Sequence, residues 1–429
     1  MRLNAQQQAA VRWVDGPLLV LAGAGSGKTS VITHKIAHLI GALDYLPEKI
    51  AAITFTNKAA REMKGRVSAQ LGSDAEGLTV STFHALGLRF LHAEAPRIGY
   101  RPGFSIFDTE DVTKLLKEIL PDGLSREGVA LAAWRISRWK AEGLLPDEIS
   151  PGDDSEARAA EAYAEYAERM ARFNAFDFDD LILRPARLLE RDEEVREKWQ
   201  QRFRHILVDE YQDTNAIQYR MLNSLLGPRL GLTAVGDDDQ SIYGWRGAQP
   251  ENLAQLARDH PELKVIKLEQ NYRSVRNVLK AANALISHNP HDFEKRLWSD
   301  LGEGDPIRIV ECAGDDDEIE KLVAAIQYRR FTAKNGWRDF AVLYRSNHQA
   351  RRIEQAFRAH QMPYQLSGGA SFFDRVEIKD LLAYVRLLAN PRDDGAFLRV
   401  INTPRRELGA TSVEIVAEQA RARGVSSET

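Results

Sequence analysis

The fold of this 429-residue chain is decided by the stretch Ala22-Gly23-Ala24-Gly25-Ser26-Gly27-Lys28-Thr29. An apolar run at residues 18–21 precedes it, and a segment with helical spacing follows from Lys28 to about residue 40. Backbone N–H groups can surround a phosphate only where side chains are small, and the N-terminus of the next helix adds positive charge. A strand, a glycine-rich turn and a helix in this order therefore predict a phosphate-binding loop in an α/β fold.

Two side chains at the end of this loop carry the expected chemistry. Lys28 is placed to reach the β- and γ-phosphates of a nucleotide, and Thr29 to hold Mg²⁺. Ala22 stands where the consensus has glycine, which is a mild departure. The alternative is a glycine-rich turn with a chance lysine, whereas a dinucleotide-binding fingerprint is excluded because the glycine spacing differs.

A phosphate-binding loop needs a carboxylate partner at the end of another buried strand. Residues 206–208 form a short apolar run that leads directly into Asp209 and Glu210. We expect Asp209 to position Mg²⁺ and Glu210 to polarise the attacking water, which is the pattern of a hydrolase rather than a kinase. Taken alone, paired acids after a strand are usually a solvated turn, so this interpretation depends on Lys28.

The rest of the chain predicts a doubly wound parallel sheet that is interrupted by helices. Strands are expected at 18–21, 51–54, 206–208, 232–235 and 265–267, whereas residues 85–203 contain no convincing strand. A second α/β unit is expected from Ser274, with strands at 307–310 and 341–344, and helices again after 374. The predicted segments are 1–84 and 204–273 for the first α/β domain, 85–203 for a helical insertion, 274–374 for the start of a second α/β domain, and 375–429 for the start of a further helical insertion.

Composition restricts the setting of the protein. The 58 Lys and Arg against 62 Asp and Glu give a net charge of −4, so contacts with nucleic acid must come from local basic grooves. The single cysteine, Cys312, excludes a disulfide scaffold. No apolar run approaches the roughly 18 residues of a membrane helix, and the first residues do not resemble a signal peptide. We expect no membrane association and a cytoplasmic location.

Three further stretches carry a resemblance to a known family. They are Asp209-Glu210-Tyr211-Gln212-Asp213-Thr214, then residues 235–248 around Gln240 and Trp245, then Gln270-Asn271-Tyr272-Arg273-Ser274. Their order and length resemble the UvrD/PcrA/Rep group of superfamily 1 DNA helicases, and the start of the chain is most similar to the Rep branch. The resemblance implies a RecA-like core with a helical insertion and part of a second RecA-like domain.

The resemblance also implies roles at the nucleotide. Gln7 matches the glutamine that reads adenine, and an amide can both donate to and accept from the purine edge. Tyr272 matches a residue that stacks on the base, and Arg273 matches an arginine that reaches the γ-phosphate. Gln240 matches the sensor between the γ-phosphate and the DNA. With Lys28, Asp209 and Glu210, these residues form the expected ATP and Mg²⁺ site.

A second set of residues matches positions that contact DNA in the family: Phe55, Thr56, Asn57, His84, Tyr243, Trp245, Arg246 and Arg345. Single strands bind to aromatic rings beside a cationic groove, which suits the Tyr243 and Trp245 pair. The alternative is that both rings lie in the core. Arg61 and Lys64 could share a helical face with Asn57, but a solvated face is nearly as good an explanation. A role for His84 as a metal ligand is not expected, because no second ligand lies at the required spacing.

Two charged stretches remain ambiguous in the sequence. Residues 134–140 alternate aromatic rings and cations, and we favour an amphipathic helix with buried tryptophans over a contact with phosphates. Residues 345–358 carry four Arg against Glu354, and only Arg345 is expected to contact DNA. Asp237, Asp238 and Asp239 are expected to point in different directions as an ordered turn rather than to form a metal site.

The function that the resemblance implies is an ATP-dependent 3′→5′ helicase on single-stranded DNA and at single-strand to duplex junctions, acting in replication with possible replication partners. The alternatives are a repair-type UvrD/PcrA-like helicase, the helicase half of a recombination nuclease, or a DNA-binding module that uses ATP only as a ligand. The family's later motifs are not found in this sequence. We therefore expect an N-terminal portion that binds nucleotide weakly, hydrolyses it poorly and unwinds inefficiently, of unknown oligomeric state.

Overall fold

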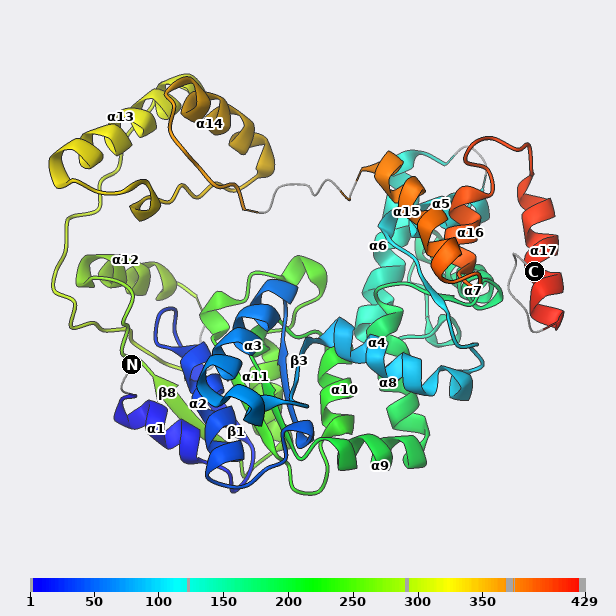
Figure 1. Ribbon diagram of the computed structural model, residues 1–429, viewed down its shortest axis with the longest axis horizontal. Coiled ribbons are helices and arrows are strands. Elements are labelled where there is room, and N and C mark those ends of the chain that lie inside the picture. The colour runs from blue at the N-terminus through cyan, green and yellow to red at the C-terminus, as the bar shows by residue number, and fades with distance from the viewer. Residues whose placement is uncertain (1–2, 122–123, 290–292, 368–372, 374, 424–429) are drawn as a thin grey trace. The chain divides into compact units, whose positions relative to one another are not determined.

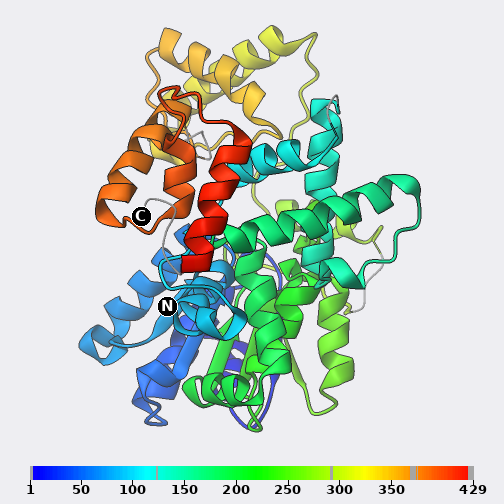
Figure 2. The ribbon, with the colours of Figure 1, turned by 90° about the vertical axis from the view of Figure 1, so that its right-hand side faces the viewer.

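A computed structural model describes residues 3–121, 124–289, 293–367, 373 and 375–423 (Figures 1 and 2). The chain divides into two compact units. The first comprises Met1–Gly304 together with Ala383–Thr429, and the second comprises Asp305–Leu382. Among the described helices, none has the length and apolar character that crossing a membrane requires.

A six-stranded parallel sheet forms the centre of the first unit. In spatial order its strands are β3 (Thr79–Thr82), β2 (Ile50–Thr54), β6 (His205–Val208), β7 (Leu232–Gly236), β1 (Leu18–Ala22) and β8 (Lys264–Leu268). All strands run in one direction, so their carboxyl ends meet at a single edge. That edge carries the phosphate-binding loop after β1 and the acidic pair after β6.

Helices cover both faces of this sheet because the strands are buried on both faces. Leu18, Val20 and Ala22 of β1 pack into one core, and Leu19 and Leu21 pack into the other. The first core contains residues from α1 (Ala5–Arg12), α2 (Lys28–Gly41) and α3 (Asn57–Leu71). The second contains residues from α4 (Phe83–Glu94), α8 (Asp180–Arg191), α9 (Glu193–Arg202), α10 (Ala216–Leu225) and α11 (Glu251–Asp259). The sheet predicted from the apolar runs is confirmed.

The helical insertion between β3 and β6 has its own core. Its further helices are α5 (Thr109–Ile119), α6 (Arg126–Glu142) and α7 (Asp154–Arg172). It also contains a two-stranded parallel sheet, β4 (Ser105–Ile106) with β5 (Ala175–Phe176), which corrects the prediction of an insertion without strands. Two-residue strands are too short to give a sequence pattern, so only the pairing of distant segments defines them. The remaining elements of the first unit are α12 (Arg276–Ile286), α16 (Asp394–Val400), which lies beside β4, and α17 (Ala410–Arg423), beside α7 (Figure 2).

The second unit contains the helices α13 (Asp315–Ala333) and α14 (Asn347–Ala359), which pack through Val323 and Ile326. The strands predicted at 307–310 and 341–344 do not form. Ile309 and Leu343 are 93% and 94% exposed, because no neighbouring strand within the described part of this unit covers them. An apolar run becomes a strand only when another backbone accepts and donates its hydrogen bonds. The boundary with the first unit falls inside α15 (Val376–Ala389).

Short 3-10 helices complete the described structure. They are η1 (Pro47–Lys49), η2 (Gly72–Ala75), η3 (Ala95–Ile98), η4 (Pro146–Glu148), η5 (Tyr211–Asp213), η6 (Asp238–Gln240), η7 (Gly244–Arg246) and η8 (Trp337–Asp339). Three of them, η5, η6 and η7, follow β6 and β7 at the carboxyl edge of the sheet. Several of the predicted site residues therefore lie on short turns that follow buried strands.

Candidate nucleotide site and nucleic-acid interface

Four consecutive carbonyl groups of the phosphate-binding loop are held by hydrogen bonds, three of them from residues outside the loop. Ser26 Oγ donates to Gly23 O at 2.7 Å, and Asn271 Nδ2 donates to Ala24 O at 2.5 Å. The N–H of Tyr272 donates to Gly25 O at 2.9 Å, and Gln7 Nε2 donates to Ser26 O at 2.9 Å. Fixing the carbonyls fixes the peptide planes, and with them the directions of the loop N–H groups. The loop is thus organised for an anion before any anion arrives.

Two glycines in the loop are required by the backbone. Gly25 and Gly27 have φ angles of 73° and 92°, in the left-handed region that side chains disfavour. A Cβ atom at Gly25 would come within 2.7 Å of the Cβ of Arg273. Gly27 also provides the N-cap of α2, so the first turn of that helix directly continues the loop.

Lys28 and the acidic pair meet at the carboxyl edge of the sheet. Lys28 Nζ lies 2.9 Å from Glu210 Oε2, and the Lys28 side chain is only 10% exposed. Asp209 is buried at the end of β6, and desolvation, together with the neighbouring Glu210 carboxylate, raises the pKa of Asp209 to about 6. Glu210 adopts φ 51°, an unusual value for a residue other than glycine. Backbone strain of this kind is concentrated at functional sites.

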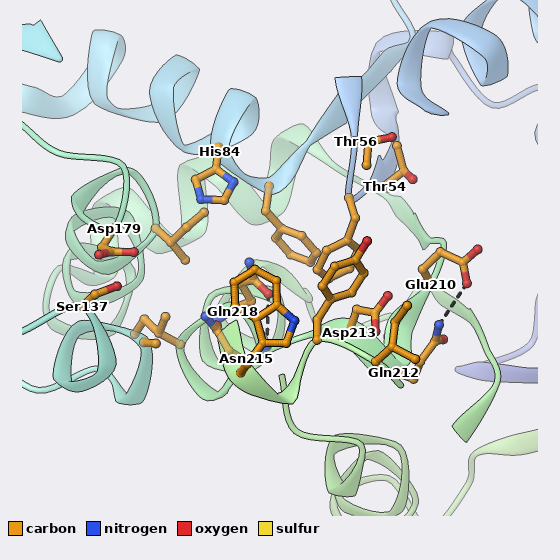
Figure 3. Close-up of a pocket in the computed structure, with 18 of the residues that line it drawn as sticks. Thr54, Thr56, His84, Ser137, Asp179, Glu210, Gln212, Asp213, Asn215 and Gln218 are labelled. Carbon is orange, nitrogen blue, oxygen red and sulfur yellow. Dashed lines mark hydrogen bonds between the residues drawn. The ribbon is translucent and has the colours of Figure 1, made fainter. Parts of the chain in front are cut away.

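A series of hydrogen bonds continues from Glu210 to the turn after β7. Gln212 Nε2 donates to Glu210 Oε2 at 3.0 Å, as the dashed line in Figure 3 shows, and Gln212 Oε1 accepts from the N–H of Asp237 at 3.0 Å. The amide of Gln240 then donates to the Asp237 carboxylate. Lys28 is therefore linked to Gln240 through side chains of three intervening residues.

The remaining predicted nucleotide residues lie against the same loop. Gln7 is buried, and its amide both bonds to Ser26 and accepts from the N–H of Asn4 at 2.9 Å in the N-cap of α1. The hydroxyl of Tyr272 accepts from Asn4 Nδ2 at 2.9 Å, and Arg273 is exposed beside Gly25. Thr29 lies in the first turn of α2, half-buried. The fold brings all the predicted nucleotide residues together, although no contact distinguishes their individual roles.

A pocket of about 680 Å³ adjoins this site (Figure 3). Its lining includes Thr54, Phe55, Thr56, Phe83, His84, Trp134, Ser137, Lys140, Asp179, Ile182, Glu210, Gln212, Asp213, Gln240, Ile242, Tyr243 and Trp245. Figure 3 shows Glu210 and Gln212 on one side of the pocket, and His84, Ser137 and Asp179 on the other. The residue whose carboxylate contacts Lys28 therefore also lines the pocket.

Several aromatic rings line the pocket. Trp245 is 66% exposed, and its ring lies 6.4 Å from that of Tyr243, so the alternative that both rings are core is wrong for Trp245. Phe55 packs edge-on against the buried Phe83 at 5.9 Å. Desolvation, followed by the Asp177 carboxylate, raises the pKa of Asp179 to about 7, which reduces the negative charge on the far wall. The pocket is suited to flat, apolar groups such as bases.

The other predicted DNA residues are placed less directly. Thr56 caps α3 by accepting from the N–H of Ala59 at 3.1 Å, and Asn57 is exposed at the start of that helix. The side chain of Arg246 lies outside the described part of the chain. Arg345 is exposed in the second unit, where its N–H donates to Gln349 Oε1 at 3.0 Å. His84 lies in the first turn of α4. Residues 79–82, immediately before this helix, form a strand that was not predicted.

Two aromatic residues of the pocket region were missed. Trp134 was expected to be buried, but it is 50% exposed and lines the pocket, whereas Trp139 on the same helix stacks on Tyr163 at 6.3 Å. Phe178 is 51% exposed, with its ring 6.4 Å from His84. The two tryptophans are five residues apart, which places them about 140° apart around α6, and the packing of the neighbouring helices decides which one is covered.

The prediction for the acidic turn (Asp237, Asp238 and Asp239) needs a correction. Their carboxylate oxygens do not diverge but lie within 4.8 Å of one another. The Lys295 ammonium lies among them, 2.7 Å from Asp237 Oδ1 and 2.8 Å from Asp239 Oδ2, and it also contacts Asp238. The short η6 helix turns the three side chains to one side. A lysine therefore occupies the place where a cation would bind.

Comparison with known proteins agrees with this geometry. Residues 3–261 match the UvrD/REP helicase N-terminal domain, which is more than half of the chain. The chain belongs to the UvrD/REP helicase family. Residues 266–427 of this family member also match the UvrD-like helicase C-terminal domain.

Relatives in the family extend beyond the residues of this chain. The ATP-dependent DNA helicase Rep of Salmonella typhimurium and that of Escherichia coli are each 51% identical to this family member over 432 residues. The alignments cover 99% of this chain and 64% of each relative. The ATP-dependent DNA helicase PcrA of Leuconostoc citreum is 43% identical, with 99% of this chain and 57% of the relative covered. The chain thus spans less than two thirds of these relatives.

Proposed function

We propose that the protein is an ATP-dependent DNA helicase of the Rep type, which moves 3′→5′ along single-stranded DNA. The observation that supports this proposal is the position of Glu210, Gln212 and Gln240. These three side chains both belong to the hydrogen-bonded series from Lys28 and line the aromatic pocket. A change in the nucleotide would therefore reach the DNA through a few directly bonded groups.

The nucleotide half of the mechanism follows from the loop. Phosphate groups would bind the N–H groups of the loop and the first turn of α2, and would draw Lys28 away from Glu210. The released Glu210 carboxylate would then orient a water molecule and accept its proton. Thr29 and the buried Asp209 would hold Mg²⁺, which when bound neutralises charge on the phosphate oxygens. Arg273 would stabilise charge on the γ-phosphate, while Gln7 and Tyr272 would contact the base.

The DNA half depends on stacking. Bases of a single strand would stack on Trp245 and Tyr243, with Phe55 and His84 further along the pocket. Thr56, Asn57, Arg246 and Arg345 would contact the backbone of the strand. The 3′→5′ direction, action at junctions during replication and a bacterial cytoplasmic location come from the family resemblance. A repair role of the UvrD/PcrA kind is the alternative, and partners at the replication fork would decide between the two.

The test is steady-state ATP hydrolysis by the chain with and without oligo(dT), alongside binding of AMP-PNP. We expect oligo(dT) to stimulate hydrolysis, and Glu210→Gln to lower kcat by about 10²- to 10⁴-fold while AMP-PNP still binds. Lys28→Ala should remove AMP-PNP binding itself. Hydrolysis that survives Glu210→Gln would contradict the proposed base, and intact nucleotide binding in Lys28→Ala would contradict the proposed site.

A further inference from the structure

The segment of residues 294–299 lies along the nucleotide site and is fixed at several points. The N–H of Trp298 donates to Glu269 O at 3.1 Å, and the carbonyl of Trp298 accepts from the N–H of Asn271 at 2.8 Å. Asn283 of α12 donates to the carbonyl of Leu297 at 2.9 Å. The segment is therefore attached both to the end of β8 and to α12.

Two side chains of this segment contact different parts of the nucleotide site. The Leu297 side chain lies against Gly23, since a Cβ atom on that glycine would come within 2.3 Å of Leu297 Cδ2. Two residues earlier, Lys295 extends to the acidic turn of Asp237, Asp238 and Asp239. Alternate residues of one extended segment thus contact the phosphate-binding loop and the turn that carries Gln240.

The contact of Lys295 with the acidic turn is close and largely shielded from water. The Lys295 side chain is 5% exposed, and the three carboxylate side chains are 4%, 14% and 16% exposed. Burial opposes the charge of Lys295, but hydrogen bonds to the three carboxylates hold its pKa above the ordinary lysine value. Without the ammonium, three like charges would repel one another in one short turn. The shape of the turn therefore depends on this lysine.

The acidic turn has two functional neighbours. The N–H of Asp237 donates to Gln212 Oε1 and its carboxylate accepts from the amide of Gln240, so the position of Asp237 sets both amides. Gln240 is followed after two residues by Tyr243, the first ring of the aromatic pair, and the hydroxyl of Ser241 donates to Gln212 O at 3.4 Å. Lys295 thus holds a turn with the γ-phosphate sensor on one side and the start of the DNA-stacking segment on the other.

We infer that Lys295 is a positioning residue that couples nucleotide binding to DNA binding, by holding the acidic turn to the 294–299 segment. The inference rests on the proposed ATP-dependent function. In the proposed mechanism, Lys295 contacts neither the nucleotide nor the DNA. It keeps Gln240 and the stacking rings in one rigid arrangement, so that a change at the loop moves both.

The test measures that coupling in the intact chain. The Kd of fluorescein-labelled oligo(dT) is measured with and without saturating AMP-PNP, and the ratio of the two is the coupling factor. It is measured for wild type, Lys295→Met, Lys295→Arg and a control, Lys198→Met. Lys198 also pairs with a buried carboxylate, Glu94 at 2.7 Å, but lies on α9 outside the pocket. Thermal unfolding of each variant identifies loss of fold.

In the wild type we expect a coupling factor of about 5-fold or more in either direction, the usual size of such linkage. Lys295→Met should bring it to within about 2-fold of unity while each ligand still binds alone. Lys295→Arg, which keeps the charge, and Lys198→Met should stay near the wild-type factor. An unchanged factor in a folded Lys295→Met variant, or no coupling in the wild type, overturns the inference. A wild-type chain that binds no AMP-PNP overturns the proposed function as well, which separates the two failures.

Discussion

Two lysines in the first unit, Lys140 and Lys295, each sit among several carboxylates, but they belong to different regions. Lys140 lies in the helical insertion, 2.7 Å from Asp177 Oδ2 and 3.0 Å from Asp180 Oδ1. Tyr166 covers it with its ring and donates its hydroxyl to Asp177 at 2.7 Å. Lys295 instead lies at the nucleotide edge, among three consecutive residues of one turn.

The difference is in what each lysine connects. Asp177 and Asp180 lie in another part of the insertion from α6, so the buried Lys140 cluster joins distant segments of the insertion. Burial opposes its charge, but the two carboxylates hold the pKa of Lys140 above the ordinary value. The carboxylates that contact Lys295 all belong to one short turn. A single cation can therefore fix the shape of that turn without connecting distant parts of the fold. The same charge chemistry thus stabilises the fold in one region and sets local geometry in the other.

The largest expected effect is on the Lys140 cluster. Lys140→Met should lower the free energy of unfolding by about 3–5 kcal/mol, because it removes the ammonium that two buried carboxylates share, although Asp180 keeps Arg184 at 3.3 Å. Urea unfolding followed by circular dichroism measures this loss. Lys198→Met, with a side chain that is 62% exposed, is the matched control and should cost much less. Similar losses for the two variants would remove the distinction between a core cluster and a surface pair.

The corresponding change at the nucleotide edge should cost less stability. Lys295→Met is expected to lower the free energy of unfolding by about 1–3 kcal/mol, since only one turn loses its charged hydrogen bonds. The three carboxylates of that turn should then accept a hard cation such as Mn²⁺. We expect Mn²⁺ to raise the melting temperature of this variant and not that of the wild type. A loss as large as that of Lys140→Met would mean that both clusters serve the fold alike.

The aromatic pocket brings the two regions together, and its two tryptophans can be compared. Trp245→Ala should weaken oligo(dT) binding by about 1–3 kcal/mol, or about 5- to 150-fold, through loss of base stacking. Trp134→Ala should have a smaller effect, because the Arg138 guanidinium lies over its ring at 5.7 Å. Fluorescence anisotropy measures both. A larger effect at Trp134 would place the main stacking surface on the helical insertion.

The stability of the protein should decrease in acid because of His205, which lies at the start of β6 in the central sheet. Burial lowers the pKa of His205 to about 3, from an ordinary value of 6.5. Between these values the unfolded chain binds a proton that the folded chain does not, so stability falls as the pH decreases below 6.5. The slope from this group reaches at most about 1.4 kcal/mol per pH unit.

His205→Gln isolates this contribution from those of the carboxylates. The free energy of unfolding of the wild type and the variant is compared at pH 7 and pH 5. Between pH 7 and pH 5 the wild type should lose more free energy of unfolding than the variant, because only the wild type carries His205. A constant difference would show that folding leaves the pKa of His205 unchanged.

Much of the nucleotide site could be predicted from the sequence, because its residues lie beside strands that are recognisable as short apolar runs. The apolar runs before Ala22 and Asp209 are buried on both faces of the sheet, and parallel strands place their carboxyl ends at one edge. The pocket was harder to predict. Trp134 and Phe178 come from the helical insertion, and their exposure depends on how α6, α7 and α8 pack. The individual roles of the nucleotide and DNA residues remain predictions.

The sequence by itself determined the phosphate-binding loop, the parallel sheet and the family, because these depend on local spacing and on long motifs in order. Only the tertiary structure decided that Lys295 lies among Asp237, Asp238 and Asp239, 56 or more positions earlier in the chain. It also decided that residues 307–310 and 341–344 form no strands, although both are short and largely apolar, like 206–208. A strand or a buried charge needs a partner, and a partner distant in the chain is found only when the chain folds.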